Sequence, residues 1–190
     1  LFYACLQRFL QAGDLLVAET GTCLLQLNAH RLPADVAMES QTLWGSIGWG
    51  TPAALGCALA EPQRRVVLVT GDGAHQLTVQ ELGVMHTAGA KPTVIVLNNG
   101  IYGVEALISE TGHAYNDLPQ WHYARLPEVF GCEGWWSGRV STRQELESAF
   151  QAIAEHSGGA YLEVLIPAEE SQPLPHELIE RLHQTSTPVG

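Results

Sequence analysis

Basic residues are scarce in this sequence, and their scarcity excludes several functions. The 190 residues include 9 Lys and Arg against 20 Asp and Glu, which gives a formal net charge of -11 at pH 7. A chain of this charge repels polyanions such as DNA and acidic membrane surfaces, so neither nucleic acid nor a membrane is expected as a partner. The GxxxxGK[ST] motif of phosphate-binding loops is also missing, so a phosphate ligand would need a bound cation to neutralise it.

Cysteine and histidine are present, but not in the patterns of a metal site or a disulfide framework. Cys5, Cys23, Cys57 and Cys132 form no CxxC pair, and the eight histidines show neither HxH nor HExxH spacing. No zinc site is therefore predicted, and the thiols are expected to be buried and free in a reducing compartment. No apolar run reaches the roughly 20 residues that span a bilayer, and no signal peptide is visible. These absences favour a cytoplasmic protein.

Short apolar stretches alternate with longer amphipathic ones along the chain. We expect strands at residues 15–18, 66–69, 93–97 and 161–166, and helices at residues 1–11, 52–60, 76–86 and 144–156. Strands that are apolar throughout and separated by helices are typical of a parallel sheet covered on both faces. The sequence therefore predicts an α/β fold, with a doubly wound, mostly parallel sheet and helices on both faces.

The domain organisation follows from the same pattern. Residues 1–190 are expected to form a single domain, and the proline-containing residues 168–190 a tail that wraps the surface. The chain begins at Leu1 rather than Met, so we expect the domain to belong to a longer protein.

The most informative pattern lies at the ends of two predicted strands. Gly71-Asp72-Gly73 follows one strand, and Asn98-Asn99 follows the next after 24 residues. If the two strands are neighbours, the Asp72 carboxylate and the Asn99 amide oxygen face the same crevice beyond the carboxyl ends of the strands. Both are hard oxygen ligands that suit Mg²⁺, which proteins usually hold by a few side chains together with phosphate oxygens. A bound metal would also supply the positive charge that a phosphate ligand needs here.

Two other interpretations compete with a metal and phosphate site. Each half of the pattern alone is also an ordinary turn, because glycine and asparagine are common turn residues. The Gly48-x-Gly50-x-x-Ala53 spacing imitates a dinucleotide fingerprint, and Asp72 lies at roughly the distance of a ribose contact. However, no apolar strand precedes Gly48, and a nicotinamide site leaves the paired asparagines unexplained.

The segment GDGAHQLTVQELGVMHTAGAKPTVIVLNNGIYGVE (71–105) resembles the signature of thiamine diphosphate enzymes. The chain is also similar to the indolepyruvate and phenylpyruvate decarboxylase branch of the 2-keto acid decarboxylases. This similarity rests on RLPADV (31–36), LWGSIG (43–48), QLTVQELG (76–83), YND (115–117) and LEVLIP (162–167). The resemblance implies a thiamine diphosphate- and Mg²⁺-dependent decarboxylase whose diphosphate-binding half is this chain. The branch that it resembles implies an aromatic 2-keto acid, indolepyruvate or phenylpyruvate, as the substrate.

The resemblance also assigns roles to individual residues. Asp72 and the Asn99 side chain become metal ligands together with the Ile101 carbonyl, and Gly73 and Ala74 bind the diphosphate through backbone N–H groups. The Gly45 carbonyl accepts a hydrogen bond from the aminopyrimidine, and Ile47 separates the two cofactor rings. Glu105 corresponds to a carboxylate that transfers a proton near the reacting carbon. The complete implied cofactor set is Gly45, Ser46, Ile47, Gly71, Asp72, Gly73, Ala74, Asn99, Ile101, Tyr102 and Gly103.

Two of these residues have alternative interpretations, because Ile47 also fits a residue of the core and Glu105 also fits a solvated charge on a helix. His75, next to the glycine turn, fits a position at a helix terminus better than a ligand contact. Gly100 and Ile101 depart from the acidic residue and glycine that often follow the paired asparagines in this branch. Thr20, Leu24 and Leu25, just past the first strand, are candidates for a substrate pocket.

The resemblance finally implies partners. The cofactor of this family lies between two domains, usually of different subunits, and the pyrimidine-binding domain supplies an activating glutamate. Nothing in this chain matches that domain, so the isolated chain is expected to be inactive, with an apolar face that favours a homodimer or homotetramer. A carboligase of the acetolactate synthase type and a non-catalytic dimerisation fragment remain the alternatives.

Overall fold

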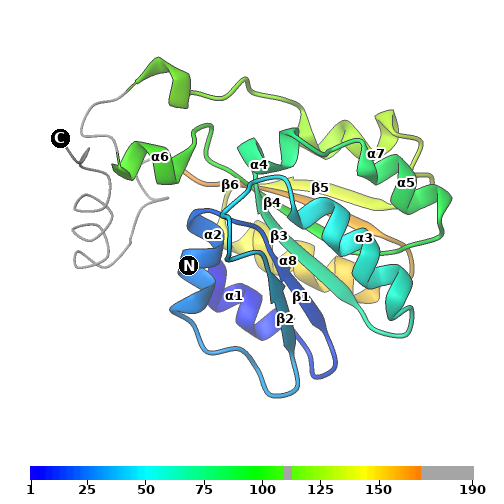
Figure 1. Cartoon of the computed structure of the whole chain (residues 1–190). Helices are drawn as coiled ribbons and strands as arrows, with labels where there is room; N and C mark the ends of the chain where they lie inside the picture. The colour runs from blue at the N-terminus through cyan, green and yellow to red at the C-terminus, as the bar shows by residue number, and fades with distance from the viewer. Residues whose placement is uncertain (109–112, 168–190) are drawn as a thin grey trace.

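A computed structural model describes residues 1–108 and 113–167, which form a six-stranded sheet with helices on both faces (Figure 1). The strands are β1 (Leu15–Ala18), β2 (Ala37–Ser40), β3 (Val66–Gly71), β4 (Thr93–Asn98), β5 (Trp136–Val140) and β6 (Ala160–Leu165). They lie in the order β2-β1-β3-β4-β6-β5, and every adjacent pair is parallel. This architecture confirms the predicted α/β fold. The expected tail at 168–190 lies outside the described residues.

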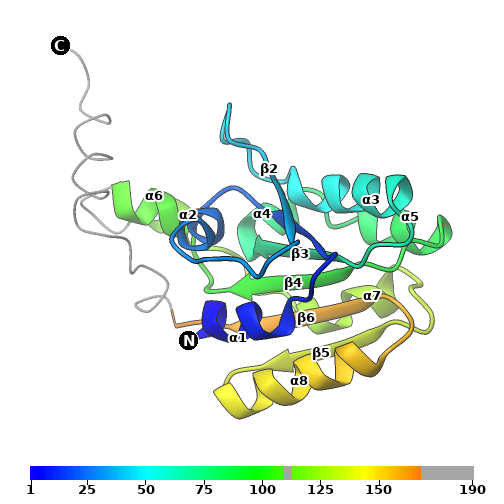
Figure 2. The ribbon, with the colours of Figure 1, turned by 90° about the horizontal axis from the view of Figure 1, so that it is seen from below.

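Helices pack on the two faces of the sheet, as the view from below shows (Figure 2). The α-helices are α1 (Phe2–Phe9), α2 (Thr22–Asn28), α3 (Gly50–Ala60), α4 (Asp72–Gln76), α5 (Glu81–Thr87), α6 (Gly103–Ile108), α7 (Leu126–Val129) and α8 (Arg143–Glu155). Two 3₁₀ helices, η1 (Ala114–Asn116) and η2 (Tyr123–Arg125), lie between α6 and α7. One apolar core joins α1, α2 and α8 to one face of the sheet, and a second joins α3 and α5 to the other.

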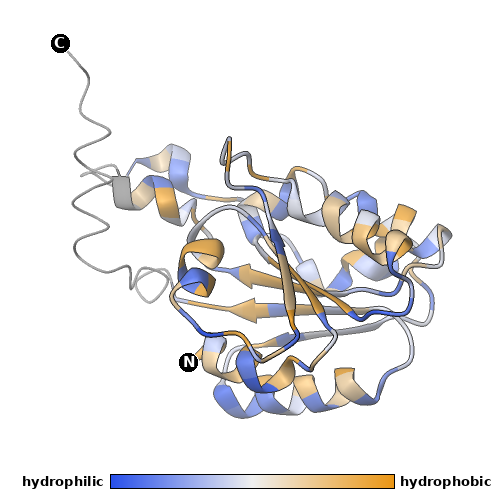
Figure 3. Cartoon of the chain, turned by 60° about the horizontal axis from the view of Figure 1, so that its bottom comes forward, coloured by the Kyte–Doolittle hydropathy of each residue, from blue (hydrophilic) through white to orange (hydrophobic). Residues whose placement is uncertain are grey.

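The four central strands supply both cores because their side chains alternate between the two faces. On β4, Ile95 and Leu97 belong to the core under α1 and α8, whereas Val94 and Val96 belong to the core under α3 and α5. Such two-sided burial requires strands that are apolar throughout. The hydropathy colouring shows this contrast between apolar central strands and helices with a polar outer side (Figure 3).

Three features of the fold depart from the sequence prediction. Strands β2 and β5 were not predicted, because both lie at sheet edges and carry partly exposed, mixed sequences instead of an apolar run. The helices α2, α6 and α7, each of seven residues or fewer, were not predicted either.

The helix expected at 76–86 is wrong, since α4 ends at Gln76 and α5 begins at Glu81. Backbone bonds between residues three apart make tight turns in this interval, and the Thr78 hydroxyl donates to the Gly48 carbonyl at 2.9 Å. Leu77, the first residue after α4, is 52% exposed, whereas Leu82 and Met85 of α5 are buried.

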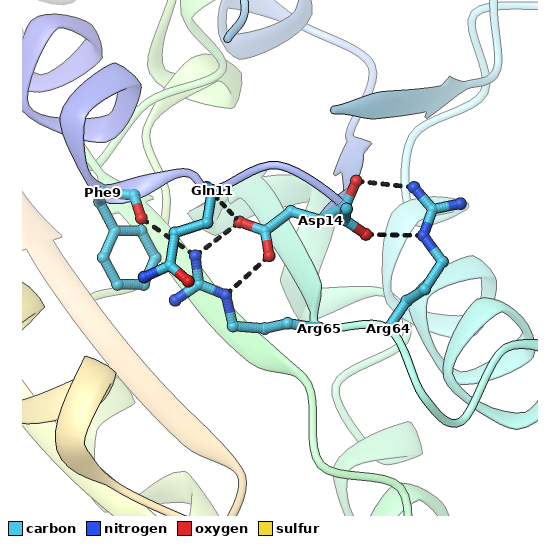
Figure 4. A network of polar contacts seen from close by, with 6 residues as sticks. Phe9, Gln11, Asp14, Arg64 and Arg65 are labelled. Atoms are coloured by element: carbon cyan, nitrogen blue, oxygen red, sulfur yellow. Dashed lines mark hydrogen bonds and ion pairs between the residues drawn. The ribbon is translucent and has the colours of Figure 1, made fainter. Parts of the chain in front are cut away.

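A polar network lies at the amino end of the sheet (Figure 4). Asp72 and Asn99 follow β3 and β4 at the opposite, carboxyl end. The Arg65 guanidinium donates to both carboxylate oxygens of Asp14, at 2.9 and 2.5 Å, and to the Phe9 carbonyl at 3.0 Å. The Gln11 N–H also donates to Asp14 at 2.8 Å, and Arg64 donates to the Asp14 carbonyl. This network joins α1 to the starts of β1 and β3. The candidate site lies at the opposite end of the sheet, where the strands end.

All four cysteine thiols are free, as predicted. Cys5, Cys23 and Cys132 are also buried as expected, whereas Cys57 is only partly buried. Within residues 1–108 and 113–167, no helix has the length and apolar character to cross a bilayer.

Candidate functional site

The two halves of the sequence pattern meet because β3 and β4 are adjacent and parallel. Val67 to Gly71 of β3 pair with Thr93 to Leu97 of β4, so Asp72 and Asn99 follow neighbouring strands at their carboxyl ends. The strand order reverses between β1 and β3, which is the kind of position at which doubly wound sheets bind ligands. The predicted proximity of the two residues is therefore confirmed.

Asp72 is a buried carboxylate at the start of α4. Its exposed fraction is 2%, and its Oδ2 accepts a hydrogen bond from the Gly100 N–H at 2.9 Å. Burial raises the pKa of Asp72 to about 6, against the lowering effect of the backbone N–H groups of Gly100 and Gly73. The charged form of a buried carboxylate is costly unless a cation lies beside it, and a bound metal ion would lower that cost.

The segment that follows Asn99 is held against residues further along the chain. An isolated antiparallel bridge pairs Ile101 with Asp117, through bonds from the Tyr102 N–H to the Asn116 carbonyl and from the Leu118 N–H to the Gly100 carbonyl, both at 2.9 Å. Neither bond uses the Ile101 carbonyl. The Ile101 N–H instead donates to the Asn99 side-chain oxygen at 3.2 Å.

Gly73 lies where no larger residue fits. A Cβ atom there would lie 2.4 Å from Cε1 of the Tyr102 ring and 2.9 Å from Cδ1 of Leu118. The Tyr102 ring therefore packs directly on the turn that begins α4. This contact explains why glycine is required after Asp72. Like the bond from the Gly100 N–H to Asp72, it also joins the start of α4 to the segment that follows Asn99.

A cavity of about 690 Å³ brings most of the predicted site residues together. Its lining includes ten of them: Ile47, Gly71, Asp72, Gly73, Ala74, Asn99, Ile101, Tyr102, Gly103 and Glu105. No lysine or arginine is among the described residues that line it. The cavity therefore offers oxygen ligands and backbone groups, and anions would enter it only together with a cation.

Gly45 and Ser46, the other two predicted residues, do not line the cavity. They lie in the exposed loop between β2 and α3, next to Leu43 and Trp44, which are 81% and 82% exposed. Gly45 has a φ of 62° and its N–H donates to the Gln41 side chain at 2.9 Å. Ile47 is the member of this loop that reaches the cavity, and its exposed fraction of 37% excludes the core interpretation.

Glu105 and Thr20 approach the cavity from other directions. Glu105 lies in the first turn of α6, is exposed and lines the cavity. Thr20, just past β1, also lines it, whereas Leu24 is buried in the core and neither Leu24 nor Leu25 lines it. Of the three substrate-pocket candidates, the structure therefore places only Thr20 at the cavity.

The oxygen atoms at this site fit a hard divalent cation better than zinc. Asp72 offers a carboxylate, Asn99 an amide oxygen and Ile101 a backbone carbonyl, which are the ligand types of Mg²⁺. Across residues 1–108 and 113–167, no group of three His, Cys, Asp or Glu side chains is arranged to hold a metal. A cation here would thus need additional oxygen atoms from a ligand such as a diphosphate.

Two buried polar residues near the site make contacts that the sequence did not predict, although His75 lies in the last turn of α4, as expected. His75 in α4 is fully buried, and its Nδ1 lies 2.9 Å from the Thr51 hydroxyl of α3, a contact between helices. Glu19, directly after β1, is also fully buried. The sequence feature that could have identified Glu19 is its position, because it follows an apolar strand just as Asp72 and Asn99 do.

Three comparisons with known proteins agree with this geometry. The family model described as "Thiamine pyrophosphate enzyme, C-terminal TPP binding domain" matches residues 19–164. An alpha-keto-acid decarboxylase of Mycolicibacterium paratuberculosis (strain ATCC BAA-968 / K-10) is 42% identical over 178 residues, which cover 93% of this chain and 31% of the relative. One of Mycobacterium ulcerans (strain Agy99) is 40% identical over 174 residues, with 91% and 31% covered.

Among solved structures, the benzoylformate decarboxylase from Polynucleobacter necessarius superposes with a TM-score of 0.77 at 25% identity. The match covers 90% of this chain and 33% of that one. The chain thus spans about a third of the length of the curated relatives that it matches.

Proposed function

The chain belongs to the thiamine pyrophosphate enzymes, as their C-terminal cofactor-binding domain, and on this premise we propose the following activity. The full gene product is a thiamine diphosphate- and Mg²⁺-dependent decarboxylase that converts a 2-keto acid to an aldehyde and CO₂. This chain supplies the half of the site that binds the diphosphate and the metal. The observation that carries the proposal is the meeting of Asp72 and Asn99 in one cavity with Glu105.

The metal site uses the oxygen atoms at the ends of β3 and β4. Asp72, Asn99 and the Ile101 carbonyl would hold Mg²⁺, and the remaining positions would be filled by diphosphate oxygens and water. The backbone N–H groups of Gly73 and Ala74, at the start of α4, would donate to the diphosphate. Because the described part of the cavity lining has no lysine or arginine, the metal would carry the charge compensation.

The chemistry divides between the cofactor and the chain. Thiamine diphosphate supplies the electron sink for the loss of CO₂ when it is bound. Ile47 would hold the two rings of the cofactor apart, and the Gly45 carbonyl would accept a hydrogen bond from its amino group. Glu105 would transfer a proton to the carbon that CO₂ leaves, since it lies in the first turn of α6 on the cavity lining.

We further propose that the substrate is an aromatic 2-keto acid, indolepyruvate or phenylpyruvate. A cavity of about 690 Å³ has room for an aromatic side chain beside the cofactor. Thr20 is one of several small residues that line it just past the end of β1. The structural neighbour named for benzoylformate, an aromatic 2-keto acid, supports the same substrate class.

A second domain must complete the site. No segment of this chain corresponds to a pyrimidine-binding domain with its activating glutamate, so that domain would come from the same protein or a second subunit in a homodimer or homotetramer. Leu43 and Trp44 expose apolar surface beside Ile47, where such a partner would make contact. The four free thiols favour a reducing, cytoplasmic location.

Calorimetric titration tests the cofactor half of this proposal. We expect this chain to bind thiamine diphosphate in the presence of Mg²⁺ and to lose that binding when EDTA is added. NAD serves as the control ligand and should give no heat of binding. Tight binding of NAD without binding of thiamine diphosphate would contradict the cofactor assignment.

Product analysis of the full gene product tests the reaction. Supplied with phenylpyruvate, indolepyruvate or pyruvate, it should release CO₂ and the corresponding aldehyde, with the aromatic acids preferred. Accumulation of a 2-hydroxy-2-methyl-3-keto acid from pyruvate would instead identify a carboligase of the acetolactate synthase type. Decarboxylation by the 190-residue chain alone would contradict the need for a second domain.

A further inference from the structure

The loop at residues 41–50 must hold its shape without a core of its own. It connects β2 to α3, and it carries Gly45 and Ile47, which the proposed function places against the cofactor rings. Leu43, Trp44, Gly45 and Ser46 are all exposed, so little apolar packing fixes this part of the backbone. We call residues 41–50 the ring loop.

The end of β1 holds both ends of the ring loop by hydrogen bonds. The Thr20 hydroxyl donates to the Gln41 carbonyl at 3.2 Å, where the loop begins. The Gly50 N–H donates to Oε2 of Glu19 at 2.8 Å, where the loop ends. Within the loop, the Gly45 N–H donates to the Gln41 side chain at 2.9 Å. The loop is thus fixed at both ends to two consecutive residues.

Glu19 is the buried member of this arrangement. Its exposed fraction is 0%, its Oε1 accepts from the Thr20 N–H at 2.9 Å, and a Cβ on Gly50 would lie only 2.9 Å from its Oε2. Burial raises the pKa of Glu19, and the backbone N–H groups of Gly50, Thr20, Gly48 and Trp49 counteract that rise. The carboxylate therefore gathers donors from the last three residues of the ring loop.

The start of α3 explains why this carboxylate is needed. The N-cap residue, Trp49, has no side chain that could accept from the first backbone N–H groups of the helix. Such groups require an acceptor when they are buried, and a carboxylate near a helix N-terminus is also favoured by the helix dipole. Glu19 provides this acceptor from a different element, so the ring loop ends at a fixed distance from β1.

We propose that Glu19 is a positioning residue of the cofactor site, which fixes the ring loop so that Ile47 enters the cavity. This role rests on the proposed function for its consequence in catalysis. The anchoring itself concerns only residues of this chain. It can therefore be tested with and without cofactor.

The test compares Glu19→Gln with Asp14→Asn in the full gene product. These two buried acids lie at opposite ends of β1, and only Glu19 bonds to the ring loop. A glutamine side chain has one acceptor oxygen, so it cannot accept from both the Thr20 N–H and the Gly50 N–H. Its neutral amide oxygen is also a weaker acceptor for the Gly50 N–H than a carboxylate oxygen, so the anchor of the ring loop is lost or weakened. Hydrogen exchange of the cofactor-free protein should become about tenfold faster at residues 48–50 in Glu19→Gln, and should remain unchanged there in Asp14→Asn.

Gly50→Ala provides a second variant that leaves Glu19 intact. Its Cβ would displace the loop from Oε2, so it should accelerate exchange at the same residues. Unchanged exchange at 48–50 in folded Glu19→Gln and Gly50→Ala would overturn the proposal, as would equal acceleration in Asp14→Asn. With thiamine diphosphate and Mg²⁺, kcat should fall about tenfold or more in Glu19→Gln and persist in Asp14→Asn. Failure of the wild-type protein to bind cofactor, with exchange as expected, would refute the proposed function and leave the anchor standing.

Discussion

The Gly100 N–H donates a hydrogen bond to Oδ2 of Asp72 at 2.9 Å, so the turn after β4 and the first residue of α4 hold each other in place. The bond joins residues 28 positions apart in the sequence, the aspartate of GDG and the glycine directly after NN. It orients the carboxylate that we propose as a metal ligand. The proposed metal site therefore depends on two strand ends together.

Replacement of Asp72 tests the metal assignment. Asp72→Ala removes the only carboxylate among the three proposed metal ligands, so Mg²⁺-dependent affinity for thiamine diphosphate should fall by about 100-fold or more. Calorimetry with and without Mg²⁺ measures the loss. Glu133→Ala, which removes an exposed acid outside the cavity, is the control and should bind as the wild type does. Unchanged affinity of Asp72→Ala would refute the metal site.

Replacement of Glu105 separates catalysis from cofactor binding. Glu105→Gln keeps the shape of the side chain but removes its ability to take part in proton transfer, so kcat of the full gene product should fall about 10²- to 10⁴-fold. The affinity for thiamine diphosphate should change less than about threefold, because Glu105 is not among the proposed diphosphate or metal ligands. A kcat near that of the wild type would show that another group transfers the proton.

Gly73→Ala tests the contact between the two halves of the site. The new Cβ would lie 2.4 Å from the Tyr102 ring, so the free energy of unfolding should fall by about 1–3 kcal/mol, together with cofactor affinity. Gly56→Ala in α3 is the matched control. A Cβ there meets nothing within 4 Å, and the loss of helical glycine should stabilise by about 0.5–1 kcal/mol. Tyr102→Ala in the Gly73→Ala background should recover much of the stability.

His75 gives the stability of the metal-free chain a defined pH dependence. Burial lowers the pKa of His75 to about 3, from 6.5, so the unfolded chain takes up this proton first as the pH falls. The contribution of His75 to the free energy of unfolding therefore decreases by about 1.4 kcal/mol per pH unit below 6.5.

Asp72 acts in the opposite direction over part of this range. Its pKa is raised in the folded chain to about 6, so its contribution to stability is greatest below its ordinary value of 3.8 and is lost as the pH rises through 6. The two effects should nearly cancel between about pH 4 and 6. Urea unfolding of His75→Gln should reveal the raised pKa values of Asp72 and Glu19 together, as stability that increases on acidification. A flat profile in this variant would contradict both assigned directions.

Arg65→Ala tests the network at the amino end of the sheet. It leaves the buried Asp14 carboxylate without its bidentate partner, so the free energy of unfolding should fall by about 3 kcal/mol. Arg143→Ala removes an exposed ion pair with Glu147 and should cost less than about 1 kcal/mol. Thermal unfolding measures both losses. Equal losses of unfolding free energy in the two variants would mean that Arg65 stabilises the fold no more than an exposed ion pair does.

The sequence predicted what depends on local composition. The four central strands are mostly apolar, with Glu163 of β6 as the charged exception, because they are buried on both faces. The pattern at residues 71–73 and 98–99 lies at the ends of two of them. Edge strands such as Ala37–Ser40 have no such run, since one side of them meets solvent. The roles of Glu19 and Tyr102 depend on which strands become neighbours and on how closely their side chains approach other residues. Local composition determines neither the strand order nor these distances.

The packing of α1 against α8 has a consequence for synthesis on the ribosome. Phe9 stacks on Phe150 with ring centroids 4.4 Å apart, and Arg8 pairs with Glu147, 139 residues later in the chain. At roughly 5–20 residues per second, α1 emerges about 7–28 seconds before its partner exists. During that interval its apolar side, with Phe2, Leu6 and Phe9, has no α8 to cover it. Nascent chains that stop before Arg143 should therefore aggregate or bind chaperones, and release from chaperones should coincide with the synthesis of α8.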